Sequence, residues 1–348
     1  MREYIDAFNA RSQAPPATSA PTPEIRFGEW LCKWLDHYAV HRCQPKTMER
    51  YRQLAAYIAS ATESEIAALA NLPLSAAGRK EIKPALFALL RLKGKRREHL
   101  SPKTVRHIAG VLSAALSDAV ELEMLPANPM LRLKGLPASE PADARSWTPD
   151  EIHALREVRR GDWTFALVEV AFASGARRGE LLALQWADID WATRILSVNK
   201  SLEQTAAGLR VKSTKGKKPR RFHLSQGAIV ALQFLQDQQK ESRRLFIGDY
   251  HDHDLIFAQP NGDYLPPDLI SQTIVRRLQK AGIKNASLHS LRHSNATNLL
   301  SKGVPLSAVS ARLGYADPSI TNRIYNHALP VDDHRAADEC DEIIGPVQ

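Results

Sequence analysis

Large apolar side chains near the start of the chain recur at intervals of three and four residues. This is the spacing of one face of an α-helix, so it predicts an amphipathic helix with a buried stripe. The residues of this stripe are Phe27, Trp30, Leu31, Trp34, Leu35 and Tyr38. A second helix is predicted to begin at Thr47, and its buried face comprises Met48, Tyr51, Leu54 and Ile58.

Two further helices are predicted in the same region. Apolar positions from Ile82 to Leu92 form the first of them. Ser101 before Pro102 supplies an N-cap and a proline in the first turn for the second. Three prolines between residues 126 and 137 then interrupt the helical pattern. We therefore predict a small all-helical domain over residues 25–137.

Segments poor in apolar residues mark the boundaries of the domains. Residues 1–24 contain several prolines among Ala, Ser and Thr, which predicts a flexible tail, and residues 138–146 form a short polar linker. A capping box at Thr148–Glu151 predicts the start of a second domain, which we place at residues 147–330. Apolar positions at near-helical spacing in residues 331–348 predict a C-terminal tail helix.

The second domain combines helices with short strands. Its predicted elements are helices at Trp163–Ala173 and Asp268–Lys280 and strands at Ile195–Val198 and Leu255–Phe257. Two more strands, Leu209–Val211 and Phe222–Leu224, flank a segment rich in lysine and arginine that contains a glycine and a proline as turn residues. We predict that these two strands pair with each other as a basic β-hairpin.

Charge and cysteine content narrow the range of functions. The 348 residues contain 47 Lys and Arg against 38 Asp and Glu, which gives a net charge of +9 and an isoelectric point near 9.5. This surplus suits a polyanionic partner such as nucleic acid. Three cysteines without metal-ligand spacing indicate reduced thiols, and the N-terminus lacks the apolar core of a signal peptide. We therefore expect a soluble, cytoplasmic protein with no membrane partner.

The stretch around His289 and Arg292 carries the strongest candidate chemistry. At a spacing of three residues on a helix, the two side chains point from one face. A buried arginine stays charged and needs an acidic partner, but no Asp or Glu lies between Asp268 and Asp317. An anion such as a phosphate would satisfy both groups, because a guanidinium can bind it through two parallel hydrogen bonds.

These residues resemble the second conserved box of the tyrosine recombinases, the phage integrase family. The matching positions are His289, Arg292, Leu313, Gly314, Tyr325 and His327. Tyr315 departs from the pattern, because most members of the family have His at this position and some have Trp. Residues 174–181 resemble the first box of the family. There Arg177 takes the position of a catalytic arginine, and Glu180 takes that of an acid that supports the site.

The resemblance implies a reaction at DNA phosphate. The Tyr325 phenolate would attack a phosphodiester, forming a 3′-phosphotyrosyl bond and freeing a 5′-hydroxyl, and a second strand would reverse the step. Arg177 and Arg292 would neutralise the phosphate in place of a metal ion. No metal and no cofactor are therefore expected.

Proton transfer would fall to other residues of the same set. His289 would assist at the nucleophile, and Tyr315 would donate a hydrogen bond where the family has His. The family also places a lysine general acid in a β-hairpin beside the scissile phosphate. Counting back from the strand at 222–224 assigns this lysine to Lys215, with Lys212 as the alternative.

The resemblance also implies a fold and partners. The expected fold is multi-domain α and α+β: an all-α core-binding (SAM-like) domain, then a mixed, mainly α-helical catalytic domain with a small β-sheet, as in tyrosine recombinases. The expected partners are double-stranded recombination sites and a homo-tetramer on synapsed DNA, with DNA-bending or directionality proteins as further candidates. The basic residues expected to contact DNA are Lys46, Lys103, Arg106, Lys212, Lys217 and Arg220.

Several alternatives stay open. The favoured function is integration or excision of a phage or other mobile element, and a housekeeping recombinase that resolves chromosome dimers is the alternative. A type IB topoisomerase uses nearly the same residues, and a DNA-binding regulator with an inactive site is the non-enzyme alternative. Purely structural roles also remain: a salt bridge from Arg177 to Glu180, solvated lysines, and a loop without metal at 251–254.

Overall fold

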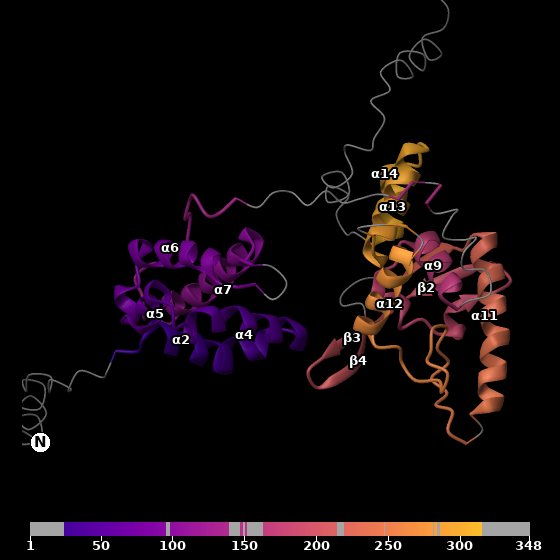
Figure 1. The fold of residues 1–348 in the computed structure, drawn as a ribbon, viewed down its shortest axis with the longest axis horizontal. Helices are drawn as coiled ribbons and strands as arrows, with labels where there is room; N and C mark the ends of the chain where they lie inside the picture. Colours follow the sequence, from indigo (N-terminus) through magenta and orange to yellow (C-terminus); the bar gives the residue numbers. More distant parts are fainter. Residues whose placement is uncertain are drawn as a thin grey trace, which may run out of the picture. The chain divides into compact units, whose positions relative to one another are not determined.

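A computed structural model describes residues 24–94, 98–138, 147–148, 150–151, 163–213, 219–246, 248–280, 282–283 and 286–314. Some predictions fall outside these ranges: the tail at 1–24 except for its last residue, the linker at 138–146 except for its first residue, the C-terminal helix at 331–348, and the roles of Lys215, Lys217, Tyr315 and Tyr325. The chain divides into two compact units, Met1–Pro141 and Ala142–Gln348 (Figure 1).

Every element of the first unit that the structure describes is helical. The α-helices are α2 (Phe27–Trp34), α3 (Val40–Arg42), α4 (Pro45–Ala59), α5 (Ser64–Asn71), α6 (Arg79–Ala88) and α7 (Pro102–Glu121). A π-helical turn joins α2 to α3 at Leu35–Ala39, and short 3-10 turns lie at Leu74–Ala76 and Leu89–Arg91. Figure 1 shows these helices gathered around one another with α7 among them.

The predicted stripe of α2 is buried in the core of this unit. Trp30 is 0% exposed, and its indole nitrogen donates to Ala115 O of α7 at 3.1 Å. The indole of Trp34 donates to Asp118 Oδ2, also on α7, at 2.6 Å. Both tryptophans therefore bury their rings while their polar nitrogens stay satisfied. Helix α2 is fixed along α7 by these contacts.

The ends of the helices follow local chemistry. The helix predicted from Thr47 begins two residues earlier, because Gln44 is extended (ψ 149°) and Pro45 occupies the first turn, where proline is tolerated. Ser101 Oγ accepts from Thr104 N at 3.2 Å, so the predicted N-cap of α7 is confirmed. Helix α5 was not predicted, because its alanine-rich sequence carries only a weak apolar stripe.

The second unit combines helices with two small antiparallel sheets, and the two-stranded sheet projects from the edge of the unit (Figure 1). The α-helices are α9 (Trp163–Ser174), α10 (Arg178–Leu181), α11 (Gln226–Leu245), α12 (Pro267–Lys280), α13 (Leu288–Ser301) and α14 (Leu306–Leu313). The strands are β1 (Ile189–Asp190), β2 (Ile195–Val198), β3 (Lys200–Thr205), β4 (Gly208–Ser213) and β5 (Arg220–His223).

The predicted pairing of the basic hairpin is wrong. Strand β4 pairs with β3, from Lys200 opposite Ser213 to Thr205 opposite Gly208, and β5 pairs with β2 in a sheet of order β1-β2-β5. The hairpin therefore turns at residues 206–207, where Gly208 (φ +117°) follows the turn. Strand β3 is mostly polar, so its sequence does not indicate a strand that could pair with β4.

One further strand prediction fails. Leu255–Phe257 forms only an isolated bridge, from Gln185 to Leu255. The apolar side chains of this segment are buried, but its backbone groups bond to two different segments. Ile256 N donates to Leu184 O at 2.9 Å, and the carbonyls of Leu255 and Ile256 both accept from Gln239 Nε2 on α11. A buried apolar run is thus not always a strand.

Helix α9 packs against both α13 and α11 in the second unit. The start of the unit is attached to α13 by Trp147, which is 1% exposed. The main-chain nitrogen of Trp147 donates to Ser294 Oγ at 2.7 Å, and its indole donates to Ser290 Oγ at 2.7 Å.

In the parts of the chain that the structure describes, no helix has the length and apolar content required to cross a bilayer.

Candidate active site

Helix α9 ends in a turn that leads to the first arginine. Gly175 has a φ of +59°, a left-handed conformation that favours glycine, and a Cβ there would lie 2.7 Å from Leu313 Cδ2. Ser174 Oγ accepts from Ala176 N at 3.0 Å within the turn. Arg177 follows as the N-cap of α10. The glycine is therefore required both for the turn and for the close approach of α14.

Glu180 lies beneath Arg177 and binds it twice. Its carboxylate accepts from Arg177 N at 2.8 Å and from Arg177 Nη1 at 3.0 Å. The side chain of Glu180 is 5% exposed, whereas that of Arg177 is 42% exposed. The structural role considered for Arg177 is therefore present, since the ion pair forms. It also holds the guanidinium at the surface, where a ligand can reach it.

Arg292 lies on α13 and is 1% exposed. Its guanidinium donates to two main-chain carbonyls, Gly175 O and Leu313 O, the second at 2.6 Å. Carbonyl oxygens accept hydrogen bonds but carry no net charge, so these two bonds fix the guanidinium without neutralising it. Arg292 is thereby attached both to the turn that precedes Arg177 and to the end of α14.

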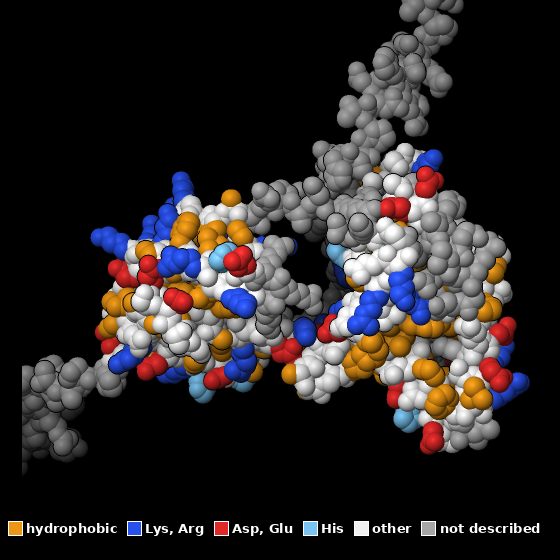
Figure 2. Space-filling model, viewed as in Figure 1, with side chains coloured by type: hydrophobic (Ala, Val, Ile, Leu, Met, Phe, Trp, Pro, Cys, Tyr) orange, Lys and Arg blue, Asp and Glu red, His pale blue; other side chains and the backbone are white. Residues whose placement is uncertain are grey.

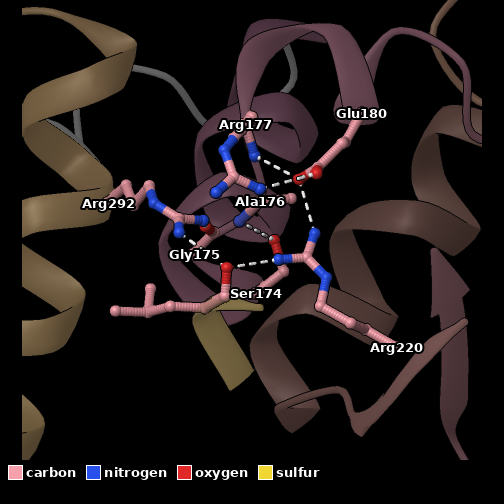
Figure 3. Close-up of polar contacts among 8 residues, drawn as sticks. Ser174, Gly175, Ala176, Arg177, Glu180, Arg220 and Arg292 are labelled. Carbon is pink, nitrogen blue, oxygen red and sulfur yellow. Dashed lines mark hydrogen bonds and ion pairs between the residues drawn. The ribbon is translucent and has the colours of Figure 1, made fainter. Parts of the chain in front are cut away.

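The end of α14 connects Arg292 to a third arginine. Arg220, the first residue of β5, donates through Nη1 to Leu313 O at 2.5 Å and through Nη2 to Glu180 Oε2 (Figure 3). Gly314 follows with a φ of +69° and ends the helix in the left-handed conformation. The Leu-Gly pair of the second box thus presents one carbonyl oxygen to two guanidinium groups.

The charges around Glu180 and His289 set their protonation states. Burial alone would raise the pKa of Glu180, but Arg220 and Arg177 outweigh it and hold that pKa below its usual range. Burial lowers the pKa of His289, and the positive charges of Arg292 and Arg177 lower it further. Both arginines therefore act on the same imidazole, and His289 is neutral at neutral pH.

His289 has a partner that the sequence did not indicate. Its Nε2 lies 3.1 Å from Nε2 of His293, one turn further along α13, and the two rings meet edge to face. Burial, His289 and Arg292 lower the pKa of His293 to about 4. Two neutral imidazoles can share a hydrogen bond when one ring nitrogen is protonated and the other is not.

Three of the residues expected to contact DNA lie in the first unit and differ in what they contact there. Lys103 is exposed, Lys46 forms an ion pair with Glu49 at 3.1 Å, and Arg106 donates to Pro137 O at 2.7 Å. In Figure 2 the visible face of the first unit carries Lys and Arg interspersed with Asp and Glu. These three basic residues therefore do not share one environment.

Two basic residues near β4 and β5 have acidic partners. Lys212 binds Glu203, whose side chain is 9% exposed, and Arg220 binds Glu180. The side chain of Arg220 is 11% exposed, so most of it lies beneath the surface, and its contact with DNA stays a prediction. This burial was not predicted from the sequence, because the basic residues around Arg220 all suggested a solvated or DNA-facing surface.

The loop at residues 251–254 alternates His and Asp, residue types that can bind a metal ion. His251 Nδ1 lies 2.7 Å from Asp263 Oδ1, and His253 Nε2 lies 3.9 Å from the same oxygen. Among the described residues, no group of three or more His, Cys, Asp or Glu side chains could hold a metal ion. These histidines therefore have a carboxylate partner that accounts for their arrangement.

Comparison with known sequences identifies relatives of this chain. A tyrosine recombinase XerC-like protein of Caldanaerobacter subterraneus subsp. tengcongensis is 29% identical over 249 residues, which cover 66% of this chain and 63% of that protein. The ICEBs1 integrase of Bacillus subtilis is 29% identical over 250 residues, which cover 70% of this chain and 67% of that protein. The match to the first relative thus spans less than two thirds of its length.

Solved structures share the fold. The Tn1549 transposon integrase in complex with a circular intermediate DNA gives a TM-score of 0.75 at 19% identity, covering 90% of this chain and 99% of that one. A lambda integrase tetramer bound to a Holliday junction gives a TM-score of 0.62 at 19% identity, covering 95% and 86%. These matches confirm the predicted fold class, that of the tyrosine recombinases.

A model of a protein family matches most of the second unit. The model, described as the phage integrase family, matches residues 147–331. This match covers more than half of the chain and includes both arginines and the histidine pair of α13. The chain therefore belongs to the phage integrase family, the tyrosine recombinases.

Proposed function

We propose that this protein is a site-specific DNA recombinase that cuts and rejoins DNA through a 3′-phosphotyrosyl intermediate. The observation that carries the proposal is the joint support of Arg177 and Arg292. Glu180 holds the first, Gly175 O and Leu313 O hold the second, and Arg220 binds both Glu180 and Leu313 O. Two guanidinium groups from distant segments are thus fixed beside one imidazole.

This arrangement suits transfer of a phosphoryl group. In-line attack on a phosphodiester concentrates negative charge on the non-bridging oxygens, and fixed cationic donors stabilise that charge without reorganising. Arg177 has an exposed guanidinium that can donate directly, and Arg292 adds a buried positive charge. Losing one such donor typically costs about 10²–10³ in rate.

The remaining roles follow the resemblance to the family. Tyr325 would form a bond from its phenolate oxygen to phosphorus while the bond from phosphorus to the 5′-oxygen breaks. Neutral His289 would accept the phenolic proton, which its lowered pKa permits, and Lys215 would give a proton to the leaving 5′-oxygen. The phosphodiester energy stays in the covalent intermediate, so reversal requires no cofactor.

We further propose that the substrate is the attachment site of a mobile element. The ICEBs1 integrase among the relatives supports this choice, and the XerC-like relative fits the housekeeping alternative. By analogy with the lambda integrase tetramer on a Holliday junction, four protomers would assemble on synapsed DNA in the cytoplasm, with accessory proteins as further partners. Direct repeats flanking the gene at a tRNA locus would distinguish the mobile element from the alternative.

The experiment that tests the reaction follows the covalent intermediate. Tyr325→Phe removes only the attacking oxygen, so it should abolish the covalent adduct on a suicide DNA substrate while DNA binding stays nearly intact. Tyr315→Phe is the matched control and should keep partial activity. If Tyr315→Phe removed the adduct and Tyr325→Phe retained it, the assignment of the nucleophile would be wrong.

A further inference from the structure

Arg220 lies at a position that neither conserved box assigns. Its side chain is 11% exposed, and its strand neighbour Arg221 is exposed. Successive residues of a β-strand point to opposite faces, so the two arginines of β5 have different surroundings. They carry the same charge and differ in what they contact.

The guanidinium of Arg220 binds the supports of both arginines at the site. Its Nη2 donates to Glu180 Oε2, and Glu180 holds Arg177 through the side chain and the main chain. Its Nη1 donates to Leu313 O at 2.5 Å, the oxygen that also accepts from Arg292 Nη2 at 2.6 Å. Figure 3 shows Glu180 between Arg177 and Arg220. One planar group therefore links the two supports.

The backbone around Arg220 leaves space for this group. A Cβ on Gly314 would lie 2.4 Å from Arg220 Cδ and 2.5 Å from Nη1, so only glycine allows the guanidinium to reach its position. A lysine could not replace Arg220, because one ammonium group cannot donate to both acceptors in the fixed planar geometry of a guanidinium. The geometry selects arginine at position 220.

We propose that Arg220 is a positioning residue that fixes Arg177 and Arg292 relative to each other on the scissile phosphate. This inference deepens the proposed function and rests on it. Without Arg220, Glu180 keeps Arg177 but loses its connection to Leu313 O, and Leu313 O loses one of its two donors. The two guanidinium groups can then shift independently, and catalysis depends on their alignment to within about 1 Å.

The test uses two scissile linkages in otherwise identical DNA. In the second, a methyl group replaces one non-bridging oxygen, which gives a neutral methylphosphonate. The arginines act on the charge of the phosphate, so their misplacement should matter much less on the neutral linkage. The full-length variants Arg220→Met, Arg220→Lys and Arg221→Met are compared with the wild type. The readout is single-turnover formation of the covalent adduct at saturating DNA.

The expected pattern separates positioning from DNA binding. Arg220→Met should cleave the phosphodiester about 100-fold more slowly than the wild type, since Arg177 and Arg292 are then no longer aligned on the developing charge. On the methylphosphonate its rate should lie within roughly 5-fold of the wild type, because little charge remains to be stabilised. On the phosphodiester, Arg220→Lys should cleave at a rate between those of Arg220→Met and the wild type. Arg221→Met, which loses the same charge from the exposed face, should match the wild type on both linkages.

Other outcomes overturn the inference. Equal defects of Arg220→Met on the two linkages would mean general damage. A rate that is normal at saturating DNA but reduced in a parallel measurement at lower DNA concentration would mean that Arg220 contacts a DNA phosphate. If Arg220→Met does not fold, as judged by circular dichroism, Arg220→Lys must show the same difference between linkages or the inference fails. If the wild type itself forms no adduct, the proposed function fails. A reactive wild type with an unaffected Arg220→Met rejects only the inference.

Discussion

The contact between His289 and His293 makes the two imidazoles one titrating pair. Their Nε2 atoms are 3.1 Å apart and the rings are perpendicular, with centroids 4.7 Å apart. A hydrogen bond between them requires one protonated and one unprotonated nitrogen, so adding a proton to both rings would break it. His293 therefore influences which nitrogen of His289 carries the proton at neutral pH.

This pair predicts a pH dependence of stability. The pKa of His293 falls from 6.5 to about 4 through burial, His289 and Arg292, so it is lower in the folded than in the unfolded chain. As pH decreases from 6.5 to about 4, the unfolded chain takes up the proton first and the folded state loses stability. His293→Gln removes this group, so its melting temperature should fall less across the window.

Thermal unfolding followed by circular dichroism at several pH values measures this difference. His107→Gln, which removes an exposed histidine of the first unit, is the control for histidine loss. Equal pH slopes for wild type and His293→Gln would show that the pair does not titrate as argued.

Gly314 provides a second test at the residue scale. With φ at +69°, an alanine there should cost about 1–2 kcal/mol in backbone strain. Its Cβ would also collide with Arg220 at 2.4 Å. Gly282→Ala is matched, because Gly282 has φ +76° and nothing within 4 Å of its Cβ. Both variants should lower the melting temperature, but only Gly314→Ala should also slow adduct formation. Equal cleavage rates for the two would contradict the role of Gly314.

The site could be predicted from the sequence only where it depends on side-chain identity. The spacing of His289 and Arg292 indicated shared chemistry, and both residues lie at the site. The position of Arg220 could not be predicted, because one of its two partners is the carbonyl of Leu313, and a carbonyl is present at every residue. The link between two segments so far apart in the chain arises only when β5 and α14 pack together.

At the scale of secondary-structure elements, helices were predicted more reliably than strands. The apolar stripe runs along α2 and into the π-helical turn that follows it, and burial of its residues from Phe27 to Leu35 confirmed it. Strand β3 instead buries two adjacent residues, Leu202 and Glu203, and leaves the others half-buried, so it lacks the alternation expected of a strand. That irregularity concealed the partner of β4 and produced the wrong hairpin.

The β3–β4 hairpin predicts which lysine is the general acid. Lys212 binds Glu203, which is nearly buried, and Arg210 lies 4.0 Å from the same carboxylate. Removing Lys212 leaves a buried carboxylate poorly compensated, which destabilises the folded state by roughly 1–3 kcal/mol. Lys212→Met should therefore lower the melting temperature but retain cleavage at saturating DNA. Lys215→Ala should keep the melting temperature of the wild type but slow cleavage.

A substrate with sulfur at the 5′-bridging position makes this comparison specific. A thiolate leaves without protonation, so loss of the general acid should slow only the ordinary substrate. Rescue by sulfur is expected for Lys215→Ala. Rescue of Lys212→Met in its place would move the general acid to Lys212.

At the scale of the whole molecule, each unit has a hydrophobic core of its own. The core of the first unit is drawn from Phe27 to Met130, and that of the second from Trp147 to Leu291, with a smaller cluster from Ala296 to Leu313. Among the residues that the structure describes, neither core contains a buried side chain from the other unit. Each unit has enough length to bury a core independently.

The described network around Arg177, Arg220 and Arg292 lies wholly within the second unit. We therefore predict that a fragment of residues 142–348 folds cooperatively and forms the covalent adduct at saturating DNA, within about 10-fold of the full chain, since no charged donor of the site is removed. Its affinity for DNA should be weaker. The logarithm of the DNA-binding constant falls linearly with the logarithm of the salt concentration. This slope should be shallower for the fragment, by about 0.9 for each DNA phosphate that the first unit neutralises in the full chain. Binding titrations at several salt concentrations measure this slope. A folded fragment that makes no adduct at any DNA concentration would show that the first unit supplies part of the chemistry.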